Sequence, residues 1–373
     1  MGEAVKADYA LPPHGAPVMH GAIDQIELAG LGLSRHEVID FSSNINPFGP
    51  PASVRRALAT FDPASYPDRS SYDLRQVLAE RHRCTPEEVL VGNGSNELIH
   101  LVARALLQRH DTALVIGPTF GEYAYASQLA GAQVIEWRAR EANDFAIDPA
   151  AIAHMITRIK PRVVWLCTAN NPTGVALEAR HLIQILHACE ASGSLLVLDR
   201  AYATMERGGS DGSLRLIDQC VTPHVIRLYS LTKLYALAGL RLGYLIADAV
   251  TVKQITAYQP TWSVNGAAQT AGLAALADQA FVRDTLPQLW HSSDQLRVGL
   301  AALGLRVLRS SLPFMLVRTG DGAGTRSALL QHGYLVRDCA SFGLPAYVRI
   351  APQRIEQNAR LLAAWREVLG HEV

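Results

Sequence analysis

The sequence predicts an α/β protein with a large, mostly parallel sheet flanked by helices, and a smaller α+β domain. Through the middle of the chain, short apolar runs such as VLVG, ALVIG, VVWLC and LLVLD alternate with helical patterns. Strands separated by helices of about ten to fifteen residues usually pair in parallel, with helices on both faces of the sheet. After Pro260 the pattern changes to a long Ala/Leu-rich helical stretch (264–303), followed by short β-rich runs and a final helix.

The domain boundaries follow from these changes of pattern. With 373 residues, the chain exceeds one typical domain. The Pro/Gly-rich segment NINPFGPP (44–51) is a candidate hinge into the large domain. We therefore expect an N-terminal arm that also joins the small domain (1–45), a large domain (46–262), and a linker helix with a small C-terminal domain (263–373).

Composition excludes several functional classes. Lys+Arg and Asp+Glu balance at 34 each, whereas nucleic-acid-binding proteins usually carry a basic surplus. The 5 cysteines are scattered without C-x-x-C, and the 13 histidines show no H-E-x-x-H spacing, so we expect reduced thiols and no metal. The N-terminus lacks a signal-peptide pattern, and no apolar run reaches about 18 residues. We expect a cytoplasmic protein that binds neither nucleic acid nor membrane.

Chemically useful side chains stand where the expected strands end. GNGSNE offers Ser95 at a helix start, PTFGEY offers Phe120, NNPTG offers Asn171, and LLVLD ends at Asp199. The carboxyl ends of parallel strands form the ligand crevice of such sheets. Each residue alone has a more ordinary explanation: a helix cap, a core aromatic or a turn. In this order, however, they supply phosphate donors, a ring stacker, an oxygen ligand and an acid for a pyridinium nitrogen.

A later segment, RLYSLTKLYALAGLRLGYLIA, places Lys233 and Arg241 in largely apolar surroundings. Buried cations are costly unless an anion meets them. A phosphate could meet Arg241, and Lys233 could form a Schiff base with a carbonyl. SLTK also matches the S-x-x-K of serine acylases, with Ser230 as nucleophile, but their K-T-G and S-D-N motifs are absent.

Together these motifs resemble those of the fold-type I pyridoxal-phosphate enzymes, in the aminotransferase class I/II superfamily, over most of the chain. The resemblance implies pyridoxal 5'-phosphate as cofactor and a catalytic set of Lys233, Asp199 and Tyr202. Tyr66 resembles a tyrosine that reaches the cofactor of the partner subunit, which implies a homodimer. The implied cofactor-binding residues are Ser95, Asn96, Phe120, Asn171, Asp199, Tyr202, Ser230, Lys233, Arg241 and Tyr66.

Within the superfamily, the chain resembles the threonine-phosphate decarboxylases of cobalamin synthesis and the histidinol-phosphate aminotransferases. The stretches IDFSSNINPFGPP and TWSVNGAAQTAG favour the decarboxylases. The resemblance implies an amino-acid substrate with a phosphate, bound by Arg349, Arg337, Asn171 and His20. An aminotransferase with a phosphorylated or different amino-acid substrate remains the alternative, because the same residues serve both reactions.

The sequence departs from these relatives at two places. Ala22 and Ile23 follow Gly21 where the relatives have glycine and asparagine, which weakens the case for a phosphate contact from the N-terminal arm. Arg200 in DRAY replaces the usual acid of D-E-A-[YF]. Cofactor binding should survive this change. The added cation predicts either a different substrate or a partner acid that the sequence does not identify.

A non-catalytic pyridoxal-phosphate sensor is a further alternative. Such regulators carry a DNA-binding helix-turn-helix ahead of this fold. The N-terminal region of about 45 residues is too short and not basic enough for that role.

Overall fold

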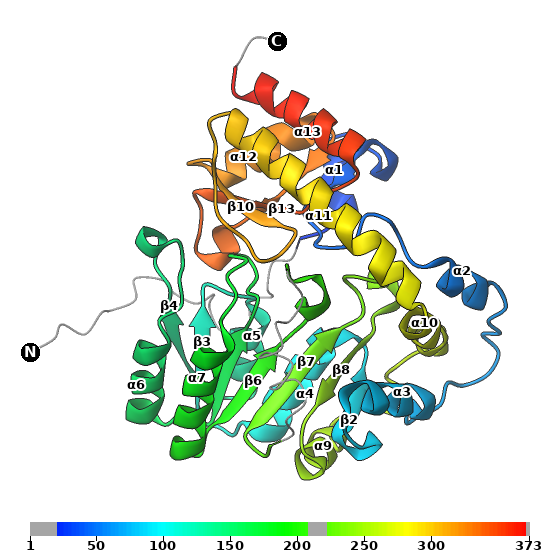
Figure 1. Cartoon of the computed structure of the whole chain (residues 1–373), viewed down its shortest axis with the longest axis vertical. Helices are drawn as coiled ribbons and strands as arrows, with labels where there is room; N and C mark the ends of the chain where they lie inside the picture. Colours follow the sequence, from blue (N-terminus) through cyan, green and yellow to red (C-terminus); the bar gives the residue numbers. More distant parts are fainter. Residues whose placement is uncertain (1–20, 208–221, 371–373) are drawn as a thin grey trace, which may run out of the picture.

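The computed structural model describes residues 21–207 and 222–370, which form a large and a small lobe (Figure 1). The large lobe contains a seven-stranded sheet. Only β8 runs antiparallel to its neighbours, so the prediction of a mostly parallel sheet is confirmed. The strands, in sheet order, are β2 (Val89–Gly92), β8 (Gly243–Ile246), β7 (Val225–Ser230), β6 (Leu195–Asp199), β5 (Val163–Cys167), β3 (Thr112–Gly117) and β4 (Gln133–Arg138).

The central strands read as continuous apolar runs because helices bury both faces of the sheet. On β5, Trp165 and Cys167 pack into the core under α4 (Gly94–Leu106), α5 (Glu122–Leu129) and α9 (Ala249–Thr256). Val164 and Leu166 point to the opposite face, under α6 (Pro149–Ile159) and α7 (Ala179–Ser192). The β2–β8 end is covered by α2 (Ala52–Ala59), α3 (Tyr72–His82) and α10 (Gly266–Ala277).

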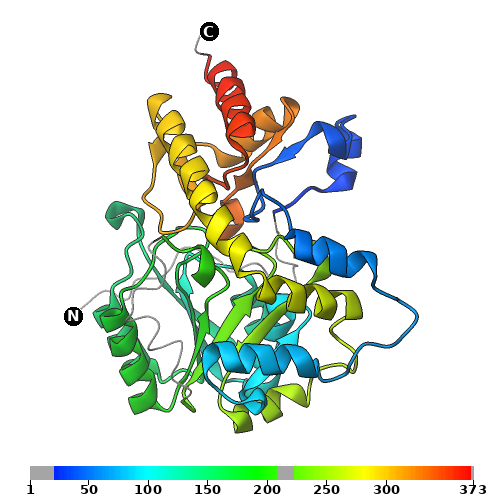
Figure 2. The same cartoon turned by 45° about the vertical axis from the view of Figure 1, so that its right-hand side comes forward.

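The small lobe combines the C-terminal part of the chain with residues near its start. Its antiparallel sheet has the order β12 (Arg337–Asp338), β13 (Tyr347–Ile350), β10 (Met315–Arg318), β9 (Arg306–Val307). It packs with α12 (Gly322–Gln331) and α13 (Ile355–Val368). The early segment adds α1 (Gln25–Gly30) and β1 (Ile39–Asp40), and β1 pairs in parallel with β11 (Tyr334–Leu335). Figure 2 shows this blue segment beside the orange strands.

The helical stretch expected over 264–303 is interrupted. The α10 helix ends at Ala277 and α11 (Gln279–Ala302) begins after Asp278. The Asp278 carboxylate accepts a hydrogen bond from the Phe281 N–H, which caps the new helix. The α11 helix then runs from the large lobe to the small one (Figure 1).

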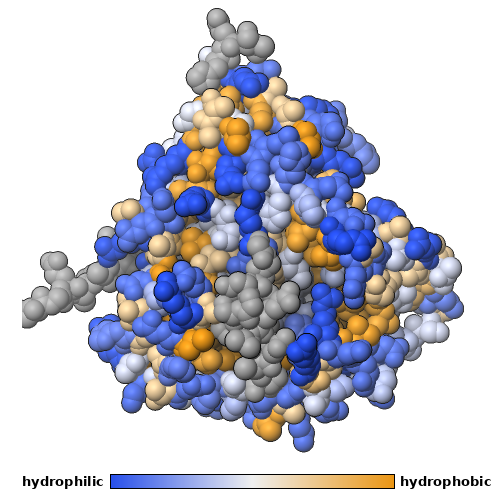
Figure 3. Space-filling view, in the orientation of Figure 1, coloured by the Kyte–Doolittle hydropathy of each residue, from blue (hydrophilic) through white to orange (hydrophobic). Residues whose placement is uncertain are grey.

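Short 3₁₀ turns complete the structure. They are η1 (Arg35–Glu37), η2 (Pro86–Glu88), η3 (Glu141–Asn143), η4 (Ala203–Met205), η5 (Ala238–Leu240) and η6 (Ala340–Phe342). On the face shown in Figure 3, hydrophobic residues lie in small groups among hydrophilic ones, as is normal for a protein surface. Among the described helices, none is long and apolar enough to cross a membrane.

Candidate functional site

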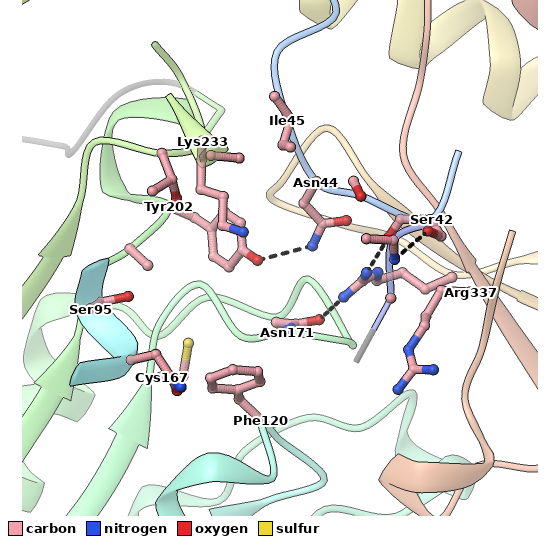
Figure 4. Close-up of a pocket in the computed structure, with 18 of the residues that line it drawn as sticks. Ser42, Asn44, Ile45, Ser95, Phe120, Cys167, Asn171, Tyr202, Lys233 and Arg337 are labelled. Carbon is pink, nitrogen blue, oxygen red and sulfur yellow. Dashed lines mark hydrogen bonds between the residues drawn. The ribbon is translucent and has the colours of Figure 1, made fainter. Parts of the chain in front are cut away.

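A cavity of about 410 Å³ lies where the carboxyl ends of the large sheet meet the small lobe. Its walls come from strand ends of the large sheet, from residues 21–45, and from the small-lobe segment that includes β12 and β13 (Figure 4). Ten of the residues singled out in the sequence line this cavity. They are Ser95, Asn96, Phe120, Asn171, Asp199, Tyr202, Lys233, Arg241, Arg337 and Arg349.

Two other candidates, Ser230 and Tyr66, are not among the residues that line the cavity, and the place of a third is not described. Ser230 ends β7, and its Oγ is 2.6 Å from Oγ1 of Thr232, which lines the cavity in its place. Tyr66 is 80% exposed and stacks on Trp262 with ring centres 4.6 Å apart, outside the cavity wall. His20 lies outside the described residues.

Lys233 follows β7, and its amine enters the cavity (Figure 4). Burial is the main cause that lowers the pKa of this amine to about 8, and the positive charges of Arg349 and Arg241 lower it further. The carboxylate of Asp199 opposes the shift. An amine with a pKa near 8 has a substantial neutral fraction at physiological pH, which makes it a nucleophile.

Asp199 stands at the end of β6 with its carboxylate buried in the cavity wall. Oδ1 accepts a hydrogen bond from the Ala201 N–H at 2.8 Å, and Oδ2 accepts one from the Tyr123 hydroxyl at 2.6 Å. Burial raises the pKa of Asp199, and these hydrogen bonds, with the charge of Lys233, work against the increase. The carboxylate is therefore fixed in orientation and suited to pair with a protonated ring nitrogen.

Tyr123 is a site residue that the sequence patterns did not reveal. Its ring stacks on Trp165 with centres 5.3 Å apart, and the Trp165 indole N–H donates to Ser127 Oγ at 3.0 Å. Ser127 Oγ in turn donates to the Tyr123 carbonyl at 2.7 Å. This closed set of contacts holds the phenol that orients Asp199. Tyr123 lies three residues after Phe120 in PTFGEY, where a second aromatic was the available signal.

Replacing Tyr123 by phenylalanine tests this orienting contact. The change removes the hydroxyl that donates to the buried carboxylate of Asp199 and leaves the ring in place. We expect the free energy of unfolding of the cofactor-free protein to fall by about 1.5–3 kcal/mol. Urea denaturation measures the change, and Tyr125→Phe on the same helix is the matched control. An unchanged unfolding midpoint would contradict the contact.

Two arginines lie side by side on the small-lobe wall. Arg337 on β12 and Arg349 on β13 are register partners, so their side chains share one face of the sheet. Arg349 Nη1 donates to Asn171 Oδ1, and Nη2 donates to the Ser42 carbonyl at 2.5 Å. Arg337 Nη2 donates to Ser341 Oγ at 2.7 Å. Burial lowers the pKa of both guanidinium groups, and the charge of Arg349 lowers that of Arg337 further.

The cavity as a whole is positively charged. Among the described residues that line it, Asp199 is the only carboxylate, whereas Lys233, Arg241, Arg337 and Arg349 are cationic. The buried Nε of Arg349 has no hydrogen-bond partner among the described residues. Buried cations of this kind require an anion to offset their desolvation. The charge of the cavity therefore favours a ligand with more than one negatively charged group.

Tyr202 is held on the opposite side of the cavity from Phe120 (Figure 4). Its hydroxyl oxygen accepts a hydrogen bond from Asn44 Nδ2 at 3.0 Å. Burial is the largest cause that raises the pKa of Tyr202 to about 12, so the phenol keeps its proton and can donate it in a hydrogen bond. Asn44 was not recognised as a site residue, although it lies within IDFSSNINPFGPP.

The start of α4 is suited to a phosphate. Gly94 has a φ of 81°, which favours glycine, and the Arg241 guanidinium lies close to it, with Nη2 2.7 Å from where a Cβ atom would stand. Ser95 and Asn96 follow in the first turn, where free N–H groups and the helix dipole favour an anion. The buried Oδ1 of Asn96 has no partner among the described residues. The residues present thus fit a phosphorylated cofactor.

Arg200 does not line the cavity. Its side chain is buried, and Nη1 donates to the Thr168 carbonyl at 2.8 Å and lies 3.4 Å from Glu206 Oε2. Glu206 is therefore a partner acid for Arg200, which the sequence alone did not identify.

Comparison with known proteins agrees with this geometry. The family model described as aminotransferase class I and II matches residues 36–364. The chain belongs to the aminotransferase class I and II family. As a member, it is a pyridoxal 5'-phosphate-dependent enzyme, and the expected cofactor is confirmed.

Two curated relatives in this aminotransferase family show different named activities. A threonine-phosphate decarboxylase of Salmonella typhimurium is 35% identical over 357 residues, covering 94% of this chain and 96% of the relative. A histidinol-phosphate aminotransferase of Thiobacillus denitrificans is 34% identical over 371 residues, covering 96% and 93%. Both classes of relative expected from the sequence are therefore present at similar identity.

Solved structures from the same family have the same fold. The histidinol-phosphate aminotransferase of Sinorhizobium meliloti, in complex with pyridoxal-5'-phosphate, superposes with a TM-score of 0.82 at 24% identity, covering 92% of this chain and 93% of that one. The L-threonine-O-3-phosphate decarboxylase of Porphyromonas gingivalis has a TM-score of 0.78 at 26% identity, covering 89% and 100%. The predicted fold is confirmed.

Proposed function

We propose that this enzyme decarboxylates L-threonine O-3-phosphate. The observation that carries the proposal is the pair of neighbouring buried arginines, Arg337 and Arg349, in the same cavity as Lys233. Threonine O-3-phosphate carries both a carboxylate and a phosphate, so each arginine has an anionic partner. Histidinol phosphate carries a phosphate and no carboxylate. A threonine-phosphate decarboxylase is among the relatives, at 35% identity over 94% of the chain, beside histidinol-phosphate aminotransferases of similar identity, so the choice between them depends on the two arginines.

The cavity residues divide between the cofactor and the substrate. Bound pyridoxal 5'-phosphate supplies an electron sink for the bond that breaks at the substrate Cα. Lys233 would hold it covalently, Asp199 would keep a proton at the ring nitrogen, and Phe120 would stack on the ring. Asn171 and Tyr202 donate to the ring oxygen. The proposed phosphate-binding residues are Ser95, Asn96 and Arg241, which line the cavity, and Ser230, whose Oγ contacts Oγ1 of the lining residue Thr232.

The substrate roles fall to the small-lobe wall. Arg349, oriented by its contact with Asn171, binds the carboxylate that leaves as carbon dioxide. Arg337 binds the substrate phosphate, with His20 as a further contact. The amine of Lys233 then donates a proton to Cα, which its lowered pKa makes possible near neutral pH. The product would be aminopropanol phosphate.

The proposal also includes the assembly and the setting of the enzyme. The exposed ring of Tyr66 is available to reach the cofactor phosphate of a second subunit in a homodimer. The expected arm (1–45), cofactor-binding domain (46–262) and small domain (263–373) describe each subunit. Such a decarboxylase would act in the cytoplasm, in cobalamin synthesis.

A substrate panel tests the reaction. The holoenzyme is incubated with threonine O-3-phosphate, histidinol phosphate and unphosphorylated amino acids, with and without 2-oxoglutarate, and products are identified by mass. We expect carbon dioxide and aminopropanol phosphate from threonine O-3-phosphate without any keto acid. Turnover of histidinol phosphate that requires 2-oxoglutarate would instead establish an aminotransferase.

Replacing Arg337 by glutamine tests its role toward the phosphate. The change removes one cation from the substrate side and keeps a side chain able to reach Ser341. We expect kcat/KM for threonine O-3-phosphate to fall about 10²-fold, mainly through KM, because a hydrogen bond to a charged group is lost. Binding of pyridoxal 5'-phosphate should be unchanged. An equal loss toward unphosphorylated threonine would contradict a phosphate role.

The lowered pKa of Lys233 predicts a pH dependence for cofactor attachment. The neutral amine is the reactive form, so the rate of reconstitution from the cofactor-free protein should rise about tenfold per pH unit and level off above about pH 8. Absorbance after mixing with pyridoxal 5'-phosphate measures the rate. An ordinary lysine would give a plateau only above about pH 10, which would contradict the predicted environment.

A further inference from the structure

Arg200 follows Asp199 directly at the carboxyl end of β6. Asp199 faces the cavity, whereas Arg200 does not line it. The guanidinium is nevertheless buried, with a relative exposure of 2%, and the Arg200 N–H donates to the Leu228 carbonyl on β7 at 2.8 Å. A cation is thus held beneath the cavity wall, next to the carboxylate assigned to the ring nitrogen.

The contacts of Arg200 connect two segments that carry site residues. Nη1 donates to the carbonyl of Thr168 at 2.8 Å, at the start of the segment that leads to Asn171. The same nitrogen lies 3.4 Å from Oε2 of Glu206, just after the η4 turn that follows Tyr202. Thr168 is anchored in turn, since its N–H donates to the Asp199 carbonyl at 3.2 Å. One side chain therefore ties the Asn171 segment to the Tyr202 segment.

The ion pair also sets the charge around Asp199. The positive charge of Arg200 lowers the pKa of Asp199 and so opposes the effect of burial. Glu206 is itself buried at 6% exposure, and its negative charge offsets that of Arg200. A buried pair is close to neutral while both partners are present, but loss of one leaves an uncompensated charge near the site.

We infer that Arg200 and Glu206 form a positioning pair that holds the Asn171 and Tyr202 segments together and tunes the ionisation of Asp199. Neither residue touches the substrate, and both act through their neighbours. The inference rests on the proposed contact of Asp199 with the cofactor ring nitrogen. It gives a role to the arginine of the DRAY segment, which does not line the cavity.

Opposite charge changes at the two partners test the inference. The visible absorption of the cofactor bound to Lys233 is titrated against pH in holoenzyme without substrate. The pH midpoint of this titration is compared between the wild-type protein, Arg200→Met, Glu206→Gln and the double variant. Loss of Arg200 makes the surroundings of Asp199 more negative, which favours protonated forms of the Lys233-bound cofactor, so the midpoint should rise by about one pH unit. Loss of Glu206 should lower it, and the double variant should return toward the wild-type value.

Kinetic constants give a second readout. We expect Arg200→Met to lower kcat about tenfold or more with a smaller change in KM, because Arg200 and Glu206 do not line the cavity and act only through the residues that they position. Arg200→Lys keeps the charge and should restore the midpoint, while its single ammonium restores kcat only in part. The control pair is Arg326 and Glu27 of the small lobe, 2.5 Å apart and outside the cavity wall. Arg326→Met and Glu27→Gln should leave the midpoint unchanged.

Two results would overturn the inference. If Arg200→Met and Glu206→Gln lower thermal stability but leave the midpoint unchanged or shift it in the same direction, the pair serves packing alone. If Asp199→Asn leaves the midpoint unchanged, the assignment of Asp199 fails and the inference fails with it. The titration uses no substrate, so its result does not depend on whether the enzyme proves to be a decarboxylase or an aminotransferase.

Discussion

Replacing Lys233 by alanine is expected to reduce turnover by at least about 10³-fold. The substitution removes the amine for which we propose both attachment to pyridoxal 5'-phosphate and proton donation to Cα. The cofactor should still bind without a covalent bond, because Ser95, Asn96 and Arg241 keep the phosphate end intact. Borohydride reduction followed by peptide mass analysis should find the cofactor on Lys233 in the wild-type protein and on no peptide of the variant.

Lys253→Ala is the matched control. Lys253 is exposed on α9, so its loss should change neither turnover nor the reduced peptide. Retention of near-wild-type turnover by Lys233→Ala would overturn the enzyme assignment of this cavity and favour a binding role for the cofactor.

Replacing Arg349 by glutamine is expected to lower kcat/KM by about 10²–10⁴-fold. Arg349 donates to both Asn171 and the Ser42 carbonyl, so its loss removes two contacts between segments of the cavity wall, together with the cation that we propose binds the substrate carboxylate. It also removes the largest charge effect on Lys233, so the pKa of that amine should rise from about 8 toward that of an exposed lysine. The plateau in the reconstitution rate should therefore move to higher pH.

Lysine at position 349 distinguishes charge from geometry. A lysine keeps the cation but cannot make the forked contact to Asn171 and Ser42, so Arg349→Lys should recover less than about a tenth of the activity. The control is Arg360→Lys on the exposed side of α13. Full activity in Arg349→Lys would show that the forked contact is dispensable.

Much of the large lobe was predictable because its strands and helices can be recognised from short stretches of sequence. The apolar strands of the parallel sheet and the polar residues at their ends stand out in sequence, and Asn171, Asp199 and Lys233 all line one cavity, as expected from their places at the strand ends. The antiparallel direction of β8 was not predicted, since strand direction depends on pairing between distant segments. The break in the long helix depends on one capping aspartate, Asp278, in an otherwise helical stretch.

The missed site residues depend on tertiary contacts. Tyr123 matters because its hydroxyl meets Asp199 on another strand, and Asn44 matters because it meets Tyr202, 158 residues later. Glu206 was not recognised as the partner of Arg200, because nothing in the sequence shows that two charges six residues apart will be buried together. The sequence indicates which side chains have the chemistry that the site needs, and the fold determines which of them lie in contact.

The contact between Arg349 and Ser42 affects the order in which the walls of the cavity form during synthesis. It joins segments 307 residues apart, and Arg349 also reaches Asn171, 178 residues earlier. Contacts over such separations form late, because long loops must close first. During synthesis, β13 leaves the ribosome long after β6, which ends at Asp199, and after the segment that carries Lys233. The cavity wall that carries Arg337 and Arg349 therefore forms after the part that carries Asp199 and Lys233, and a chain that stops before β13 would leave Lys233 in an incomplete cavity.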